Sequence, residues 1–191
     1  MAAFDWVRLG FACALVVAAG CDQSDVVTPP TQVADGACIN PPGATDRFVD
    51  CGNGTVTDTQ TNLIWLKDAR CFTSVMSWVT ANREVGIRLS DGRCGLTDHS
   101  KPGDWRVPGL GDWASVLVQV PGACRPSLID KTGTDCFASN PWANGIVPAF
   151  YWTSTSGVGY SSAWAADLNQ GNLLQVITGQ HFLVWAVRDG T

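Results

Sequence analysis

Apolar residues recur along this chain with the two spacings that distinguish strands from helices. Residues 54–58 and 62–67 are β-branched and apolar runs joined by a short polar link, a pattern typical of a β-hairpin. Apolar residues recur near helical spacing over 74–89 and again over 110–120, which predicts two short helices. Between the two helices, residues 91–102 are polar and predict a long loop.

The C-terminal third alternates strand-like runs with turns. Four strands are predicted there, over 150–154, 163–168, 173–177 and 181–188. The last run is apolar on both faces, as a central buried strand would be. The pattern as a whole favours an α+β fold in which two helices pack on an antiparallel sheet with long loops.

The N-terminal residues have the pattern of an export signal. Residues 9–20 are apolar and end in small side chains, but they are shorter than the roughly 20 residues that cross a bilayer. The sequence Val-Ala-Ala-Gly-Cys21 resembles the bacterial lipobox, in which the cysteine becomes the lipidated first residue. Several acyl chains on Cys21 would anchor the protein without a transmembrane helix. Ordinary secretory cleavage near Gly20 is the alternative.

These features divide the chain into three parts. Residues 1–20 are predicted to be a lipoprotein signal peptide, and 21–44 a lipidated cysteine followed by a flexible polar tether. Residues 45–191 are predicted to form one domain, in agreement with the usual size of a domain. The protein is thus expected in the bacterial cell envelope, attached to a membrane by its lipid and facing the periplasm or the cell surface.

The cysteine pattern points to an oxidising compartment. Of eight cysteines, Cys13 lies in the signal peptide and Cys21 carries the predicted lipid. Six remain: Cys38, Cys51, Cys71, Cys94, Cys124 and Cys136. An even number in an exported chain predicts disulfides, and pairing between sequence neighbours (38–51, 71–94 and 124–136) is the connectivity expected among the many that are formally allowed. The chain has no C-x-x-C, and its cysteine spacing matches no zinc pattern.

Composition narrows the class of protein further. The chain of 191 residues has 12 basic and 17 acidic residues and a net charge of −5, so nucleic acid is not an expected partner. Hydrophobic residues make up 46% of the chain, which is enough for a packed core. Nine Trp, 20 Gly and 10 Pro favour a turn-rich domain over a helical bundle.

Several segments together resemble one protein family. They are 47–58 (RFVDCGNGTVTD), 63–68 (LIWLKD), 94–98 (CGLTD), 103–108 (GDWRVP), 151–155 (YWTST), 163–164 (AW) and 184–188 (VWAVR). In this order they resemble the C-terminal domain family of the Legionella collagen-like protein, the Lcl C-terminal domain. The resemblance implies a C-type-lectin-like fold, which is more distantly similar to that of the formylglycine-generating enzymes.

The resemblance implies little about the ligand, because most members of the family are uncharacterised. The member that gives the family its name is a surface adhesin for sulfated glycosaminoglycans. The acidic balance of this chain makes a polyanionic ligand electrostatically unattractive. We therefore expect a non-catalytic module for ligand binding or adhesion, with a glycan or a protein as its partner. The alternative is a structural module of the envelope that assembles with itself into a homo-oligomer.

The sequence contains few of the motifs that would indicate an enzyme. Formylglycine chemistry would need reactive cysteines near the C-terminal strands, but the last cysteine is Cys136. The chain has no G-x-S-x-G motif, and only His99 and His181 could serve as the base of a hydrolase. Spacing alone does not exclude general acid–base catalysis by two aspartates. An enzyme on a formylglycine-generating-enzyme-like scaffold is therefore the less favoured function.

No cofactor is expected from the sequence, although one loop raises the question of calcium. Asp91, Asp98 and Asp104 flank this loop and are weak candidates for a site of oxygen ligands. The D-x-[DN]-x-[DN]-G spacing of a calcium loop is absent, and so are the E-P-N, Q-P-D and W-N-D tripeptides typical of sugar-reading calcium sites. The alternative is that these aspartates form turns and cap helices.

Aromatic residues in loops are the candidates for ligand binding. Trp142 lies in 140–145 (NPWANG) and Tyr160 in 156–161 (SGVGYS), both rich in Gly, Ser or Asn. Loops often carry binding residues, and an aromatic ring can stack on a sugar. Asn140 is the polar candidate beside Trp142. The alternative is that the two aromatic side chains cover the end of the sheet.

The other tryptophans of the domain are expected in its core. They are Trp65, Trp78, Trp105, Trp113, Trp152, Trp164 and Trp185. Arg106 and Arg188 adjoin apolar strand residues, so each is expected to be partly buried and paired with an aspartate.

Overall fold

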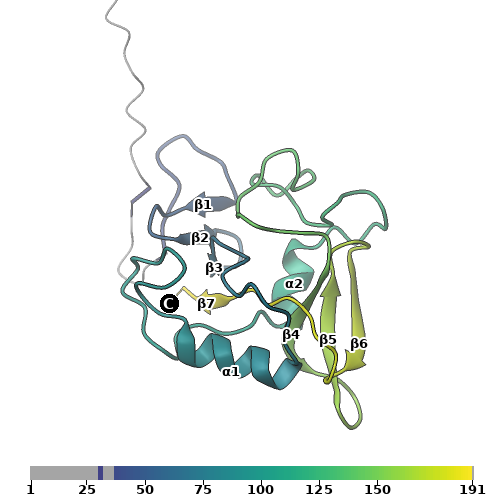
Figure 1. Ribbon diagram of the computed structural model, residues 1–191. Coiled ribbons are helices and arrows are strands. Elements are labelled where there is room, and N and C mark those ends of the chain that lie inside the picture. The colour runs from purple at the N-terminus through teal and green to yellow at the C-terminus, as the bar shows by residue number, and fades with distance from the viewer. Residues whose placement is uncertain (1–29, 32–36, 191) are drawn as a thin grey trace, which may run out of the picture.

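The computed structural model describes residues 30–31 and 37–190, and this part of the chain contains two helices and two antiparallel sheets (Figure 1). The predicted α+β class is therefore confirmed. The strands are β1 (Phe48–Asp50), β2 (Thr55–Asp58), β3 (Leu63–Leu66), β4 (Phe150–Ser156), β5 (Ser162–Asp167), β6 (Asn172–Ile177) and β7 (Val187–Asp189). The helices are α1 (Trp78–Arg88) and α2 (Leu110–Val116). The first sheet has the order β1-β2-β3-β7, and the second has the order β4-β5-β6.

The first sheet grows from the predicted hairpin. Strands β2 and β3 pair with Val56 opposite Trp65, and every residue of both strands is buried. Strand β1, which the apolar pattern did not predict, pairs with β2. Strand β7 pairs with β3 and places Val187 opposite Trp65. The beginning and the end of the domain thus share one sheet.

The second sheet contains the predicted strands β4, β5 and β6 in sequence order. The prediction of one continuous strand over 181–188 is wrong. Phe182 and Leu183 form only isolated bridges, and the chain then enters the other sheet as β7. The run is apolar on both faces because residues 184–187 are buried in the core on the way from one sheet to the other.

Both helices are shorter than predicted, because residues at their ends form bridges with other segments. Helix α1 begins at Trp78 rather than at residue 74, since Met76 pairs with Phe182. Helix α2 ends at Val116 for the same reason, because Leu117 pairs with Leu128 in a later loop. Both helices pack against β4 and so cover the second sheet.

Tryptophan side chains form the centre of the core, as predicted. Trp65, Trp105, Trp113, Trp152 and Trp185 are fully buried. The ring of Trp65 lies 5.8 Å from that of Trp113 and 4.7 Å from that of Trp185, measured between centroids. Aromatic pairs of this kind contribute about 0.5–1.5 kcal/mol each beyond the burial of their area.

Two tryptophans predicted in the core are only half-buried. The indole N–H of Trp78 donates to the carbonyl oxygen of Thr153 at 2.8 Å. Trp164 alternates along β5 with the buried Ala163 and Ala165, so its side chain lies on the opposite face of the strand. The core prediction is therefore wrong for Trp164, because periodicity does not say which face of a strand is covered.

The disulfides join the predicted neighbours, Cys38–Cys51, Cys71–Cys94 and Cys124–Cys136. Disulfides form and persist in oxidising compartments, so they indicate an extracytoplasmic location. In the described part of the chain, no helix has the length and apolar character needed to cross a membrane. The predicted signal peptide and the lipid site at Cys21 lie outside the described residues.

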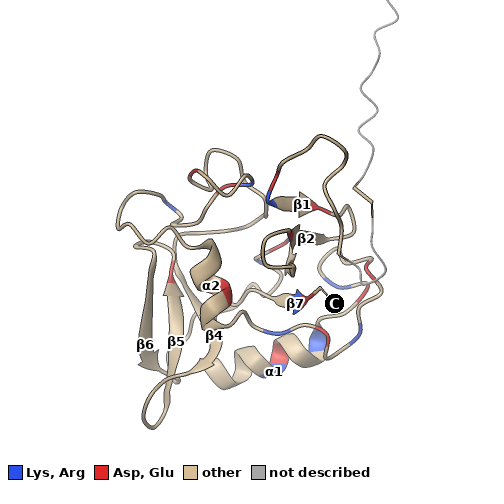
Figure 2. Ribbon diagram, turned by 180° about the vertical axis from the view of Figure 1, so that it is seen from behind, with Lys and Arg blue, Asp and Glu red and all other residues tan. Residues whose placement is uncertain are grey.

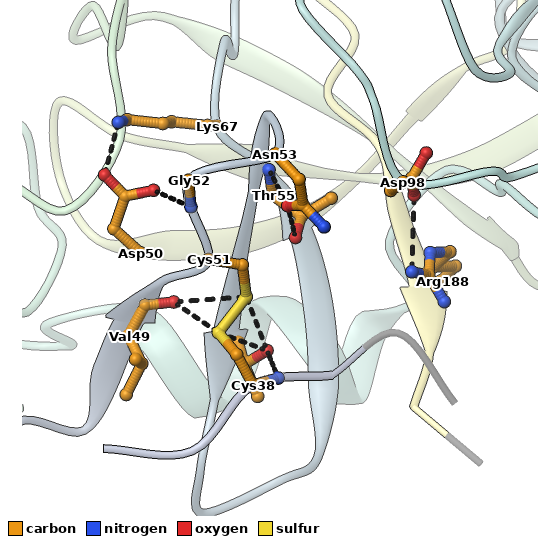
Figure 3. The surroundings of a disulfide bond; sticks show 11 residues. Cys38, Val49, Asp50, Cys51, Gly52, Asn53, Thr55, Lys67, Asp98 and Arg188 are labelled. Carbon is orange, nitrogen blue, oxygen red and sulfur yellow. Dashed lines mark hydrogen bonds and ion pairs between the residues drawn. A yellow bond between two sulfur atoms is a disulfide. The ribbon is translucent and has the colours of Figure 1, made fainter. Parts of the chain in front are cut away.

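The two arginines pair with aspartates as predicted. The guanidinium of Arg106 lies 2.5 Å from the carboxylate of Asp112 and 2.7 Å from that of Asp189. The guanidinium of Arg188 in β7 lies 3.3 Å from the carboxylate of Asp98 (Figure 3). These contacts fasten the last strand to α2 and to the polar loop that follows α1.

Candidate functional site

Three hollows border β1 and the loops beside it. Three adjoining hollows of about 310, 310 and 270 Å³ share lining residues. The first and second share Asp50 and Lys131, and the second and third share Lys67 and Asn144. We call these neighbouring hollows together the β1 groove. Small-molecule sites usually measure about 300–1,000 Å³, so each of the two larger hollows has room for a small ligand or for one end of a larger one.

Two lysine–aspartate pairs line the β1 groove. The ammonium of Lys67 donates to one carboxylate oxygen of Asp50, and the other oxygen accepts the N–H of Gly52 at 3.0 Å (Figure 3). The ammonium of Lys131 lies 2.8 Å from the carboxylate of Asp46. All four charged side chains are roughly one-third exposed, so a ligand in the groove can reach them.

The groove favours the charged form of Asp50. Burial alone raises the pKa of a carboxyl group, but here the hydrogen bonds from Lys67 and Gly52 outweigh it. The charge of Lys131 acts in the same direction, and the pKa of Asp50 is lowered from its ordinary value. At neutral pH the groove therefore presents positive and negative groups side by side.

Backbone hydrogen bonds hold the walls of the β1 groove together. The N–H of Asn144 donates to the carbonyl oxygen of Lys67 at 2.8 Å, which joins two segments far apart in the sequence. The N–H of Lys131 donates to the carbonyl oxygen of Asn140 at 2.9 Å. The carbonyl oxygen of Lys131 in turn accepts the N–H of Phe48 in β1 at 3.0 Å. The side chains of the groove are thus preorganised by the fold.

The Cys38–Cys51 disulfide holds the segment before β1 against the first sheet. The N–H of Cys38 also donates to the hydroxyl of Thr57 in β2 at 3.0 Å. Asn40 and Gly52, which closely follow the two cysteines, line the same hollow of the groove. A disulfide that closes a loop of this size contributes on the order of 3 kcal/mol. The cross-link therefore fixes one end of the groove.

Asp130 holds the loop that forms another wall of the groove. Its side chain is buried, and Oδ1 accepts the backbone N–H groups of Gly133, Thr134 and Asp135 at 2.9, 3.1 and 3.2 Å. Burial raises the pKa of a carboxyl group, but these bonds and the hydroxyl of Thr132 outweigh it and lower the pKa of Asp130.

The variant Asp130→Asn is expected to lower the free energy of unfolding by about 1–3 kcal/mol at neutral pH, because an amide is a weaker acceptor for buried N–H groups. The folded-state pKa of Asp130 is depressed. Its contribution to stability is therefore present above the ordinary value of 3.8 and is lost as the pH falls through the folded-state pKa. Urea unfolding of parent and variant over acidic pH measures this contribution, and the difference should shrink below about pH 4. A difference independent of pH would contradict this role.

Trp142, a sequence candidate for stacking on a ligand, lies in the core. It is 4% exposed and contributes only a small edge to the groove. Its ring lies parallel to that of Phe48 at 4.0 Å and nearly parallel to that of Trp185 at 5.3 Å. With both neighbours in place it has no free face for a sugar, which corrects the sequence-based expectation for Trp142. Asn140 is exposed and lines the groove, so it stays a candidate.

Tyr160, the other aromatic candidate, lies away from the groove. It is fully exposed in the loop between β4 and β5. This hairpin lies at the opposite end of the molecule from β1 (Figure 1). The structure therefore does not bring Tyr160 together with Asn140 or Trp142, and a binding role for Tyr160 would involve a separate surface.

The three aspartates considered for calcium bind their own loop. Each accepts a backbone N–H: Asp91 from His99 (3.1 Å), Asp98 from Ser100 (3.2 Å) and Asp104 from Lys101 (2.7 Å). Among the described residues, no group of three or more His, Cys, Asp or Glu side chains could hold a metal ion. The structure thus does not assemble these aspartates into a calcium site, and their bonds are those of turn-forming residues.

The charged residues of the β1 groove were not found from the sequence. Asp46 and Asp50 lie close together in the sequence, but their partners Lys131 and Lys67 come from distant segments, and no local spacing connects the pairs. One signal was present, because the chain has only three lysines and two of them line the groove. Rare lysines inside segments rich in apolar and turn residues are a reason to look for a polar site.

Comparison with known proteins identifies the domain. A search of curated proteins finds no match to the chain. The family model of the Lcl C-terminal domain matches residues 54–188, from the turn before β2 to β7. This region holds Lys67, Lys131 and Asn144 of the groove, whereas β1 lies just before it. Because the match covers most of the chain, this protein belongs to the Lcl C-terminal domain family.

Proposed function

We propose that this domain is a non-catalytic, carbohydrate-binding module of the cell envelope and that the β1 groove holds the ligand. The observation that carries the proposal is the pair of lysine–aspartate contacts beside exposed amide groups in a preformed groove. Sugar hydroxyls donate and accept hydrogen bonds, so they match walls that offer ammonium donors, carboxylate acceptors and amides side by side. The lectin-like architecture implied by the family resemblance agrees with this use.

The charge of the groove favours a neutral glycan. Asp46, Asp50 and Asp68 outnumber Lys67 and Lys131 among its lining residues. The whole chain has a net charge of −5 as well. The acidic lining residues and the net charge of the chain would both repel a polyanionic glycan, whereas a neutral sugar meets no such repulsion.

The state of Asp50 suits an acceptor of hydrogen bonds from sugar hydroxyls rather than the general acid of a glycosidase. A glycosidase needs one carboxyl group with a raised pKa, so that it can donate a proton to the leaving oxygen. Asp50 has a lowered pKa and is held by Lys67 and Gly52, so it is a poor proton donor at neutral pH. Attached through a lipid on Cys21, the module would hold a glycan beside the membrane surface or on the outside of the cell.

Binding to a glycan array tests this function. The purified, oxidised protein should retain specific neutral glycans, and Lys67→Ala or Lys131→Ala should each weaken binding about 10–100-fold. The expected factor follows from the roughly 1.5–3 kcal/mol of a hydrogen bond to a charged group. The exposed third lysine gives the matched control Lys101→Ala, which should bind like the parent.

The variants should remain folded, because partly exposed ion pairs contribute only about 0–1 kcal/mol to stability. Circular dichroism of each variant checks this point. A blank array from folded protein contradicts carbohydrate binding. Glycan binding that survives both lysine substitutions contradicts the assignment to the β1 groove.

A further inference from the structure

The half of the molecule formed by the second sheet and the start of α1 carries almost no charge. No Asp, Glu, Lys or Arg occurs in residues 71–82, 150–166 or 168–183. These segments supply β4, β6, the first residues of α1 and all of β5 except Asp167. In Figure 2 the second sheet is accordingly almost free of coloured residues. Charged residues usually make up about 25–35% of the surface of a soluble domain, so this half differs from an ordinary solvated surface.

Exposed apolar side chains gather at one end of this uncharged half. They are Val79 (65% exposed), Val158 (87%), Tyr160 (105%) and Ile177 (65%). Two hydrogen bonds place their segments side by side. The N–H of Trp78 donates to the carbonyl oxygen of Thr178 at 3.1 Å. The N–H of Thr178 donates to the carbonyl oxygen of Ser161 at 2.9 Å. Figure 1 shows the start of α1, the β4–β5 hairpin and the end of β6 at the same end of the molecule.

Strand β6 is an open edge beside this apolar end. It is the last strand of the order β4-β5-β6, and no strand of the described chain pairs with its outer side. Its sequence, NLLQVI, has no charged residue and no proline, and its register with β5 is continuous over six residue pairs. Natural proteins usually protect such edges with lysine, proline or a bulge, because unpaired backbone groups recruit another strand. Strand β6 has none of these protections.

We propose that β6 pairs antiparallel with β6 of a second copy of this chain and that the two sheets become one sheet of six strands. Two identical edges meet about a two-fold axis, so side chains of β6 face side chains of the same strand. A charged residue near the two-fold axis lies beside its own copy, and such a pair of like charges destabilises the contact. The uncharged sequence of β6 removes that obstacle.

The distribution of charge favours a second copy as the occupant. Two chains of net charge −5 repel each other, and the repulsion is smallest when they meet through their uncharged halves. Association through the first sheet and its loops would instead bring the acidic groups of both copies together. Val79, Val158 and Tyr160 add apolar area beside the strand pair, and charge depletion with exposed tyrosine is typical of interface cores.

The mass of the purified, oxidised protein in multi-angle light scattering tests this pairing. The parent is expected to have twice the mass of one chain at micromolar concentrations. Ile177→Lys and Gln175→Lys each place a charge at an exposed position of β6, and each is expected to give a monomer. Ile87→Lys is the matched control, because Ile87 is 57% exposed beside the charged residues of α1 and should leave the dimer intact.

Hydrogen exchange gives a second readout that does not depend on the variants. Amide exchange in β6 of the parent should slow as the protein concentration rises, whereas exchange in β1 should not change. A parent that stays monomeric overturns the proposal, and so does a dimer that survives both substitutions in β6. Glycan binding should be unchanged in Ile177→Lys, because the β1 groove lies at the other end of the molecule (Figure 1).

Discussion

Replacing Asp58 by Ala is expected to lower the free energy of unfolding by roughly 3–5 kcal/mol. Asp58 is fully buried at the end of β2, and both of its carboxylate oxygens accept hydrogen bonds from Arg47, at 2.8 and 2.7 Å. Arg47 is itself only 8% exposed. The substitution therefore leaves a buried guanidinium without its counter-charge, and this uncompensated charge is the main cause of the loss.

Asp58 also holds the turn of the central hairpin. Its Oδ1 accepts the N–H of Gln60 at 3.0 Å, and its Oδ2 accepts the hydroxyl of Thr61 at 2.8 Å. Arg47 directly precedes β1, so the ion pair ties that strand to the end of β2. The same substitution thus loosens the strand that forms the floor of the β1 groove, and glycan binding should weaken together with stability.

Chemical denaturation of the oxidised protein, followed by far-ultraviolet circular dichroism, measures this loss. Asp50→Ala is the matched control, because its ion pair with Lys67 is partly exposed and should contribute no more than about 1 kcal/mol. The double variant Arg47→Met with Asp58→Leu should recover part of the stability, because no unpaired charge remains. An equal loss for Asp58→Ala and Asp50→Ala would contradict a structural role of the buried pair.

The parts of the fold that sequence reasoning predicted are those made by close neighbours in the chain. Strands β2 and β3 form one hairpin, and β4, β5 and β6 follow one another, so their turns and apolar runs predict both the strands and their pairing. The disulfides also join neighbouring cysteines along the sequence. In these cases the contacts in the structure join neighbouring segments, so the local sequence pattern is enough to predict them.

The parts that were missed depend on contacts between distant segments. The apolar run over 181–188 reads as one strand, but nothing in it says that its end pairs with β3 of the other sheet. The β1 groove has the same origin, because Asp50 and Lys131 meet only after β1 and the later loops come together. The predicted α+β class was correct, whereas the division into two sheets and the position of the site required the structure.

Trp142 shows how a local pattern can mislead, and Trp142→Ala is expected to lower the free energy of unfolding by about 3–5 kcal/mol. Its neighbours Asn, Pro and Gly are typical of an exposed loop, yet the ring packs between Phe48 and Trp185. Its indole N–H also donates to the carbonyl oxygen of Ile129 at 3.0 Å. The substitution leaves a large cavity beside Phe48 and Trp185 and removes the hydrogen-bond donor to the carbonyl oxygen of Ile129.

Tyr160→Ala is the matched control for this substitution, because both residues are aromatic and both lie in loops rich in small residues. Tyr160 is fully exposed in the single chain, so in the monomeric Ile177→Lys background its replacement should change the free energy of unfolding by no more than about 0.5 kcal/mol. Chemical denaturation followed by far-ultraviolet circular dichroism compares the variants without relying on the fluorescence of Trp142. Equal losses for the two variants would contradict the burial of Trp142.

A third variant separates packing from ligand binding. Trp142→Phe keeps an aromatic ring beside Phe48 but removes the N–H that pairs with Ile129, so it should cost less stability than Trp142→Ala. Because both faces of the indole are covered, the folded Trp142→Phe protein should bind a glycan as the parent does. If the glycan affinity of Trp142→Phe falls while Lys67→Ala binds normally, the ring of Trp142 contacts the sugar and the lysine–aspartate pairs do not bind it.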